Sequence, residues 1–294
     1  MACPSCQGDA TQASERRTAL GYHLFRCRPC RRTVNARTGT PVNHVQVPTD
    51  SALLVVLWRL RSKLSLRDVA ELFLTRGFTF RHETVRAWEA RFAPLLTARL
   101  RAKRRGKARL RWHCDETSVK VDGRWRYLYR AIDADGNLVD AILSETRDMD
   151  AAKRFFARVR TVVGHAPATV TTDGHDAYPR AIREEWGADV PHRTSRYLNN
   201  RMARDHPGVK QRSYPMRGFG SFTSATHVCS AHDELRDHCR LRQHLNETVS
   251  LADQRRLFQA RWRSVRALLQ AASPQARPAH DGTMRARACV CSES

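Results

Sequence analysis

The sequence predicts a multidomain protein: an N-terminal zinc ribbon, an all-α helix-turn-helix segment, and an α/β core. Three observations predict this order. Two Cys-x-x-Cys pairs stand near the N-terminus, residues 49–97 carry apolar side chains at helical spacing, and residues 110–186 alternate short apolar strands with helices. At 294 residues, the chain is long enough to build more than one domain.

The composition indicates what kind of binding partner to expect. The formal net charge is +23, from 52 Lys and Arg against 29 Asp and Glu. Such a field attracts a polyanion, and nucleic acid is the commonest one. An arginine-rich codon bias raises the Arg count but does not explain the net excess. The sequence has no apolar run of 18 residues and no signal-peptide core, so we expect a soluble cytoplasmic protein without a membrane partner.

Residues 1–45 are expected to form the zinc ribbon. The four ligand candidates are Cys3, Cys6, Cys27 and Cys30. Each Cys-x-x-Cys pair forms a tight turn, called a knuckle. Two knuckles supply four thiolates in a tetrahedron around one Zn²⁺ with no open position, so the zinc is expected to be structural. Two alternatives remain at this point: free structural thiols, and His23 replacing one of the cysteines.

Residues 46–98 read as three helices. The first covers 52–60, the second opens at Ser65 with Asp68 completing a capping box, and the third spans about 81–96. A short helix, a turn containing Gly77 and an Arg-bearing helix outline a helix-turn-helix, whose second helix enters the DNA major groove. A three-helix bundle that binds nothing shares this outline. The residues expected to contact DNA are Arg81, Arg86 and Arg91.

Residues 99–109 are expected to be a basic linker. The segment carries Lys or Arg at seven positions and no acid. A solvated linker and a phosphate-contacting arm both fit this composition, and one segment can do both. Lys103, Arg104 and Arg105 are the candidates for DNA contact.

Residues 110–245 are expected to form the α/β core. Two short apolar strands end in carboxylates, Asp115 and Asp173, and an Asp-Gly turn at 122–123 joins the first strand to the second. Three hairpin-linked strands, a helix, a strand and another helix follow the order of the ribonuclease-H-like fold, the fold of retroviral integrases. Carboxylates at two neighbouring strand ends can share metal ions for phosphoryl transfer, which needs two cations roughly 3.5–4 Å apart. The alternative is that both are ordinary strand-end aspartates.

The C-terminal part is expected to contain one helix and a tail. Residues 246–272 are expected to form one helix, with Leu257, Trp262 and Leu268 as apolar anchors. Residues 273–294 are expected to be a disordered tail, in which Cys289 and Cys291 have no partners for a second metal site.

Several of these motifs together resemble a known family. They are the two Cys-x-x-Cys pairs, the helix-turn-helix outline, and the segments 115–130, 172–179 and 218–222. The chain resembles a bacterial DDE insertion-sequence transposase, closest to the insertion-sequence six family, over residues 1–260. The resemblance implies an enzyme that binds the terminal inverted repeats of its element and uses Mg²⁺ or Mn²⁺ to cut a strand and join its 3′-hydroxyl to target DNA. It also implies a homodimer or higher oligomer associated with the bacterial nucleoid, with Asp115 and Asp173 as the first two catalytic acids.

The third acid of the family pattern is missing. The family places a Glu where this chain has Ala203, within residues 197–206. Asp205 lies about 200° further round the helix and points away. Glu116 follows Asp115 on a strand and is expected to point to the opposite face. The DNA-contact candidates near this helix are Arg201, Lys210 and Arg212, for which a solvated face is the alternative.

The sequence therefore predicts a transposase whose chemistry is impaired. A second hypothesis is a non-catalytic DNA-binding protein, acting as repressor or dominant-negative partner of an active transposase. A third is a nuclease of the same fold, against which the DNA-binding front half and the insertion-sequence motifs argue.

Overall fold

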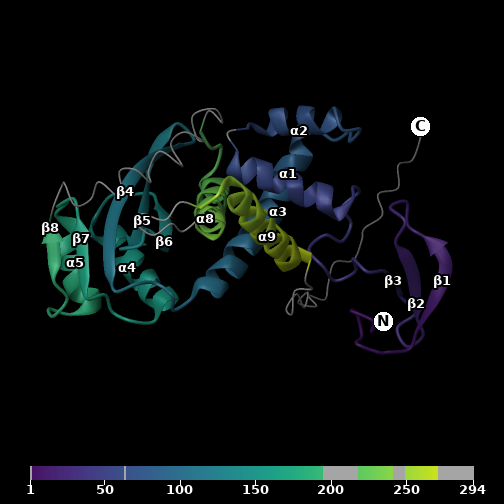
Figure 1. Ribbon diagram of the computed structural model, residues 1–294, viewed down its shortest axis with the longest axis horizontal. Helices are drawn as coiled ribbons and strands as arrows, with labels where there is room; N and C mark the ends of the chain where they lie inside the picture. The colour runs from purple at the N-terminus through teal and green to yellow at the C-terminus, as the bar shows by residue number, and fades with distance from the viewer. Residues whose placement is uncertain (1, 63, 195–217, 241–248, 271–294) are drawn as a thin grey trace, which may run out of the picture.

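The structure is a computed structural model, and it describes residues 2–62, 64–194, 218–240 and 249–270. Figure 1 shows three parts in a row: a small N-terminal sheet, a group of helices, and a mixed α/β unit. None of the described helices is both long and apolar enough to cross a membrane.

The N-terminal part is a three-stranded antiparallel sheet. It contains β1 (Thr11–Arg17), β2 (His23–Cys27) and β3 (Thr33–Val34) in the order β1-β2-β3. Its small core consists of Cys3, Cys27 and Val34. A core of this size buries too little apolar surface to hold a fold alone, so a metal or another staple is needed.

The predicted helices of the second part are present. They are α1 (Thr49–Arg61), α2 (Leu66–Leu74) and α3 (His82–Arg104). The capping box is confirmed, because the Ser65 hydroxyl accepts from the Asp68 N–H and the Asp68 carboxylate accepts from the Ser65 N–H.

The linker predicted for residues 99–109 is wrong for its first half. α3 continues to Arg104, because its apolar face continues: Leu96 and Leu100 are both buried in the helix interface. Basic side chains occupy only the remaining positions of these turns, and they do not prevent a helix that is held by packing.

The α/β part has a five-stranded sheet with the order β6-β5-β4-β7-β8. Its strands are β4 (Arg111–Val121), β5 (Arg124–Asp133), β6 (Leu138–Ser144), β7 (Thr169–Thr172) and β8 (His192–Thr194). β4, β5 and β6 form an antiparallel meander, whereas β7 and β8 run parallel to β4. This is the strand order of the ribonuclease-H-like fold that the sequence predicts.

Helices cover both faces of this sheet. α4 (Met149–Val163) and α5 (Ala177–Trp186) pack with Trp112, Cys114 and Tyr129 on one face. α8 (Phe222–Cys239) packs on the other face, against Val119, Leu128 and Leu143. Asp148 caps α4 by accepting from the Ala151 N–H, and Gly164 ends it in the left-handed conformation.

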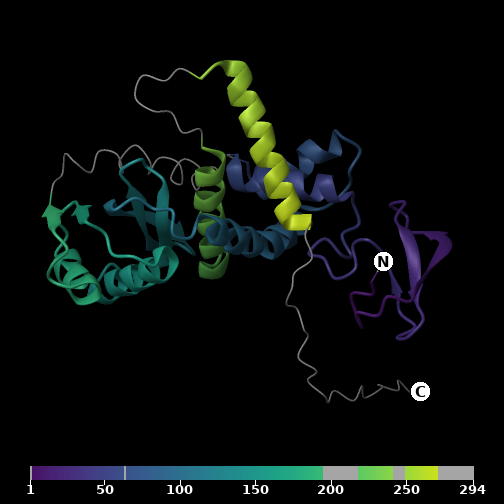
Figure 2. The same cartoon turned by 60° about the horizontal axis from the view of Figure 1, so that its bottom comes forward.

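One apolar core joins the helical part to the α/β part. The same cluster contains residues of α1, α2, α3 and α8 and of the sheet face beneath α8. α9 (Leu251–Gln270) lies along this group and contacts α1, α3 and α8 (Figure 2). The segments predicted as separate domains at 46–98 and 110–245 therefore pack as one body, with α8 between them.

The predicted C-terminal helix is present, but one of its three anchors is wrong. Leu257 is 40% exposed, whereas Val265 and Leu269 are buried, and Trp262 and Leu268 pack against the core. Residues 273–294, including Cys289 and Cys291, lie outside the described residues.

Candidate active site at the ends of β4 and β7

The parallel pairing of β4 and β7 sets the two aspartates side by side. His113 pairs with Thr171, so the same register, two residues on, puts Asp115 level with Asp173. β7 ends at Thr172, and Asp173 is the first residue after it. In β4 the strand continues past this level to Val121, so Asp115 lies at an open edge rather than at a strand end.

Three carboxylates meet at this edge. One oxygen each of Asp115, Glu116 and Asp173 lie within 4.8 Å of one another. Carboxylate oxygens are the preferred ligands of Mg²⁺ and Mn²⁺, and groups this close can bind one cation or bridge two. The donor set therefore fits the divalent cation that the sequence predicts.

Glu116 corrects an expectation. Alternation along a strand predicts that its side chain points away from Asp115, yet its carboxylate reaches the cluster. Because β7 ends at Thr172, none of the described strands pairs with β4 at the level of Asp115 and Glu116, and side chains from both faces can extend past this edge. Glu116 also accepts hydrogen bonds from the Tyr178 hydroxyl and from Arg147.

The three carboxylates repel one another. Burial, followed by the charges of Glu116 and Asp173, raises the pKa of Asp115 to about 7. Arg147 opposes this effect, and its Nη2 lies 4.0 Å from Oδ2 of Asp173. A divalent cation would relieve the remaining repulsion, so the electrostatics favour the same ligand as the geometry.

The sequence predicts the third acid of the family pattern at position 203. Ala203, and with it Arg201, Lys210 and Arg212, lies in residues 195–217, outside the described residues.

The other arginines and lysines predicted to contact DNA fall into two groups. Five are exposed and belong to α3 or its ends: Arg81, Arg86, Arg91, Lys103 and Arg105. Arg104 is different, because its guanidinium donates to Glu234 at 2.7 Å and to Asp140 at 3.2 Å, and to the carbonyl of Val139 at 2.6 Å. The prediction that Arg104 contacts DNA is therefore wrong: its donors are used inside the protein.

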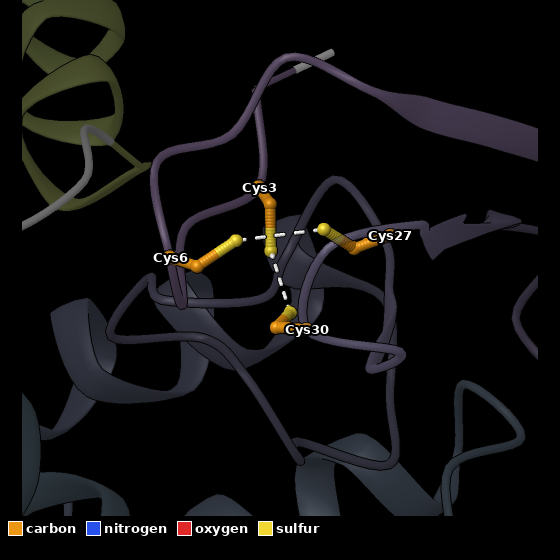
Figure 3. Close-up of side chains that lie close together, drawn as sticks. All are labelled: Cys3, Cys6, Cys27 and Cys30. Carbon is orange, nitrogen blue, oxygen red and sulfur yellow. Dashed lines mark hydrogen bonds between the residues drawn. The ribbon is translucent and has the colours of Figure 1, made fainter.

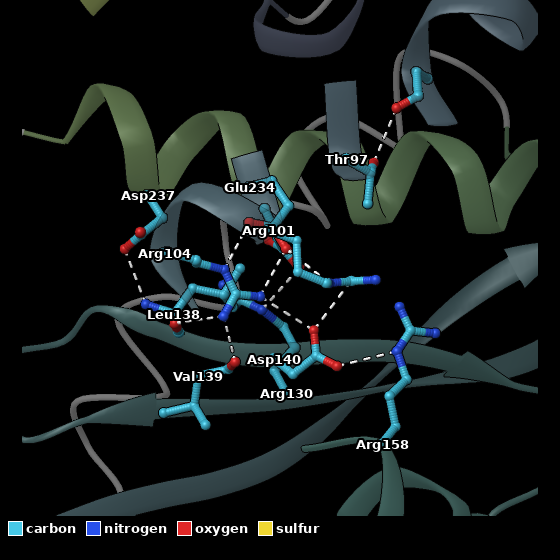
Figure 4. Close-up of polar contacts among 12 residues, drawn as sticks. Thr97, Arg101, Arg104, Arg130, Leu138, Val139, Asp140, Arg158, Glu234 and Asp237 are labelled. Atoms are coloured by element: carbon cyan, nitrogen blue, oxygen red, sulfur yellow. Dashed lines mark hydrogen bonds and ion pairs between the residues drawn. The ribbon is translucent and has the colours of Figure 1, made fainter. Parts of the chain in front are cut away.

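Arg104 belongs to a buried ionic network that the sequence did not predict. Asp140 of β6 has no exposed side-chain surface and pairs with Arg101 and Arg104 of α3 and Arg158 of α4 (Figure 4). Glu234 of α8 pairs with both α3 arginines. Although burial alone lowers the pKa of Arg104, the hydrogen bonds and charges of Glu234 and Asp140 raise it above its ordinary value.

This network links α3, α4, α8 and the sheet. Next to it, Arg130 of β5 pairs with Asp233 of α8 at 3.1 Å, and both side chains are almost fully buried. The one sequence signal was Asp140 itself, a carboxylate in the middle of the apolar strand at 138–143. Its partners lie far away in sequence, so nothing local indicated where they would come from.

The four N-terminal cysteines also converge. Their sulfur atoms lie within 4.8 Å of one another, with Cys3 Sγ 3.6 Å from Cys30 Sγ and Cys6 Sγ 3.5 Å from Cys27 Sγ (Figure 3). Each close pair joins one knuckle to the other, and none of the four forms a disulfide. Four sulfurs at these spacings fit a tetrahedral Zn²⁺ with Zn–S bonds of about 2.3 Å. His23 is exposed at the far end of β2, so the alternative with histidine as a ligand is not favoured.

Thiolate formation is favoured at one of these positions. Burial raises the pKa of Cys3, but backbone N–H groups of Ser5 and Cys6 outweigh it, and the net effect lowers that pKa to about 6. By contrast, Cys114, Cys229 and Cys239 are buried thiols of the core, as expected.

A family model and several sequence relatives match this chain, and they agree with one another. A family model of the DDE domain of IS240-type transposases matches residues 109–256. The chain is 35% identical over 170 residues to the transposase for the insertion sequence-like element IS431mec of Staphylococcus aureus, covering 57% of this chain and 75% of that protein. The same identity and coverage hold for the transposase for insertion sequence element IS257 in transposon Tn4003 of Staphylococcus aureus.

Two solved structures align with this chain at low sequence identity. A simian T-cell lymphotropic virus intasome in complex with the PP2A regulatory subunit B56 gamma aligns with a TM-score of 0.37 and 16% identity, covering 61% of this chain and 63% of that chain. The HTLV-2 integrase catalytic core domain in complex with magnesium aligns with a TM-score of 0.36 and 16% identity, covering 49% of this chain and 96% of that chain. The assignment of this chain depends on the family model and the sequence relatives.

Proposed function

This chain belongs to the insertion-sequence six family of DDE transposases, and from that premise we propose that it binds the terminal inverted repeats of its element while its strand cleavage and transfer are impaired. The observation that carries the proposal is the meeting of Asp115 and Asp173 at one edge of the sheet. These are the first two acids of the family pattern, and Ala203 stands at the third.

The impairment follows from the chemistry of the site. Asp115 and Asp173 would hold Mg²⁺ or Mn²⁺, with Glu116 near enough to assist. When bound, the cations would stabilise the attacking and leaving oxygens of phosphoryl transfer. A methyl group at position 203 contributes no ligand. Glu116 replaces that ligand only in part, because its two oxygens also accept hydrogen bonds from Arg147 and Tyr178.

DNA binding would use the exposed basic surface of α3. Arg81 is its N-cap residue, Arg86 and Arg91 lie along its first half, and Lys103 and Arg105 lie at its end. Phosphate contacts from such residues raise affinity without reading sequence. The cysteine cluster would hold a structural Zn²⁺ that keeps the N-terminal sheet folded next to this surface. Because transposition joins two ends, the active form is proposed to be a homodimer or higher oligomer at the nucleoid.

The experiment compares the parent chain with Ala203→Glu in strand transfer of labelled repeat-end DNA with Mg²⁺. Ala203→Gln is the matched control, because it supplies the length without the charge. We expect the Glu variant to join DNA at least about 100-fold faster than the other two, the usual effect of one well-placed electrostatic group. Equal rates for all three proteins would refute the assignment of position 203.

A second candidate function is supported by the same alanine. A chain that binds ends without cutting them acts as a repressor or dominant-negative partner of an active transposase. In that case the parent chain, added to the Glu variant, lowers strand transfer in proportion to its share of the mixture. Unchanged transfer in the mixture would exclude this second function.

A further inference from the structure

The β4–β5 hairpin carries an exposed tryptophan beyond the acidic cluster. Asp122 and Gly123 form its turn with positive φ angles of 48° and 72°, as a two-residue hairpin of the I′ type requires. Trp125 directly follows on β5 and is 61% exposed. Lys120, which pairs with Trp125 across the hairpin, is exposed as well, and so is Arg124 on the opposite face of the strand.

The register places Trp125 on the same sheet face as Glu116. Glu116 pairs with Tyr129 and Lys120 pairs with Trp125, and side chains two residues apart share a face. Between these two pairs lies Tyr127, which is half-buried. At about 3.4 Å per residue, Trp125 therefore lies roughly 14 Å along the strands from Glu116.

The hairpin is held in place from its side. The Phe219 N–H donates to the Lys120 carbonyl at 3.2 Å, and the Asp122 N–H donates to the Phe219 carbonyl at 2.7 Å. Phe219 itself is buried in the core. Trp125 is thus exposed on a hairpin whose backbone is held by hydrogen bonds to Phe219. A single exposed apolar residue is common, so the exposure of Trp125 alone does not indicate a binding site. The cationic Lys120 opposite it and the acidic cluster on the same face are the further observations.

We propose that Trp125, together with Lys120 opposite it on β4, stacks on an unpaired base of the DNA strand that leads away from the acidic cluster. An aromatic face beside a cationic side chain is the chemistry by which proteins bind single-stranded nucleic acid. Asp122 is the one acid of the turn, so the hairpin tip retains an excess of one positive charge. The idea rests on the proposed function, because it makes the hairpin part of the surface that holds the cut end.

The test measures binding and needs no catalysis. The probe is a fluorescein-labelled oligothymidine of about 16 nucleotides, the upper end of a typical single-strand site, and its anisotropy is followed with the zinc-loaded full chain in the absence of Mg²⁺. We expect Trp125→Ala to weaken binding about 5- to 150-fold, the equivalent of one stacked base. Trp125→Phe should retain most of the affinity. Leu251→Ala is the matched control, because Leu251 is also 61% exposed but lies on α9.

The outcomes separate stacking from the alternatives. Equal binding by Trp125→Ala and the parent chain overturns the proposal, and a change of mass in light scattering without a change of binding assigns Trp125 to a contact between copies. If Trp125→Phe is as weak as Trp125→Ala, stacking is also overturned. These results do not depend on strand transfer by Ala203→Glu, so the further inference and the proposed function can fail separately.

Discussion

Removing the charge of Asp140 should destabilise the protein by about 3 kcal/mol or more. Breaking a buried ion pair by removing one partner typically costs about 3–5 kcal/mol, because the other charge stays buried and unpaired. Here Asp140 is fully buried, and its oxygens lie 3.0–3.2 Å from nitrogen atoms of Arg101, Arg104 and Arg158. Asp140→Asn keeps the shape and one acceptor oxygen, so it isolates the loss of charge.

We expect a value near the lower end of this range, because two of the three arginines keep another acidic partner. Arg101 and Arg104 keep Glu234 as a partner after the change, whereas the Arg158 contact with Asp140 loses its negative charge. Urea unfolding followed by circular dichroism gives the free-energy difference from the midpoint and slope. The same experiment on Asp135→Asn is the control, since the Asp135–Arg109 pair is exposed and such pairs contribute about 0–1 kcal/mol. If Asp140→Asn costs no more than Asp135→Asn, the network does not hold α3 against the core.

Three further predictions concern the metal sites and the helical part. Cys6→Ser should lower the zinc content of the purified chain, measured by atomic absorption, and unfold the N-terminal sheet, whereas Cys239→Ser should leave the zinc content unchanged. The raised pKa of Asp115 lets the folded chain keep a proton that the unfolded chain releases near pH 4, so the contribution of Asp115 to stability without Mg²⁺ should fall as pH rises from about 4 to 7. Asp115→Asn should therefore be more stable than the parent at pH 8 and equal to it at pH 4. A difference in thermal melting temperature that is the same at both pH values would contradict this. Ser65→Ala should cost about 1 kcal/mol in urea unfolding through loss of the α2 cap, and a neutral result would show that packing alone starts the helix.

Local sequence signals determined most of the elements. The Asp-Gly turn, the Ser65–Asp68 capping box and the Cys-x-x-Cys knuckles each depend on residues a few positions apart, so their geometry follows from the chain itself. The same holds for the alternation of short apolar strands and helices, which predicted the ribonuclease-H-like order. The sequence pattern also predicted that Asp115 and Asp173 lie side by side, but only Asp173 follows a strand end; Asp115 lies within β4, and the parallel register of β4 and β7 sets the two level.

Only the tertiary structure decided how the charged residues are used. Arg104 looks like its basic neighbours in sequence, yet α8 and β6 bring Glu234 and Asp140 against it and bury it. Glu116 alternates away from Asp115 along the strand, yet the end of β7 opens an edge where both carboxylates meet. The apolar pattern of a segment decides its local structure, but the partner of a charge depends on which distant segments pack beside it, and that is a property of the whole fold.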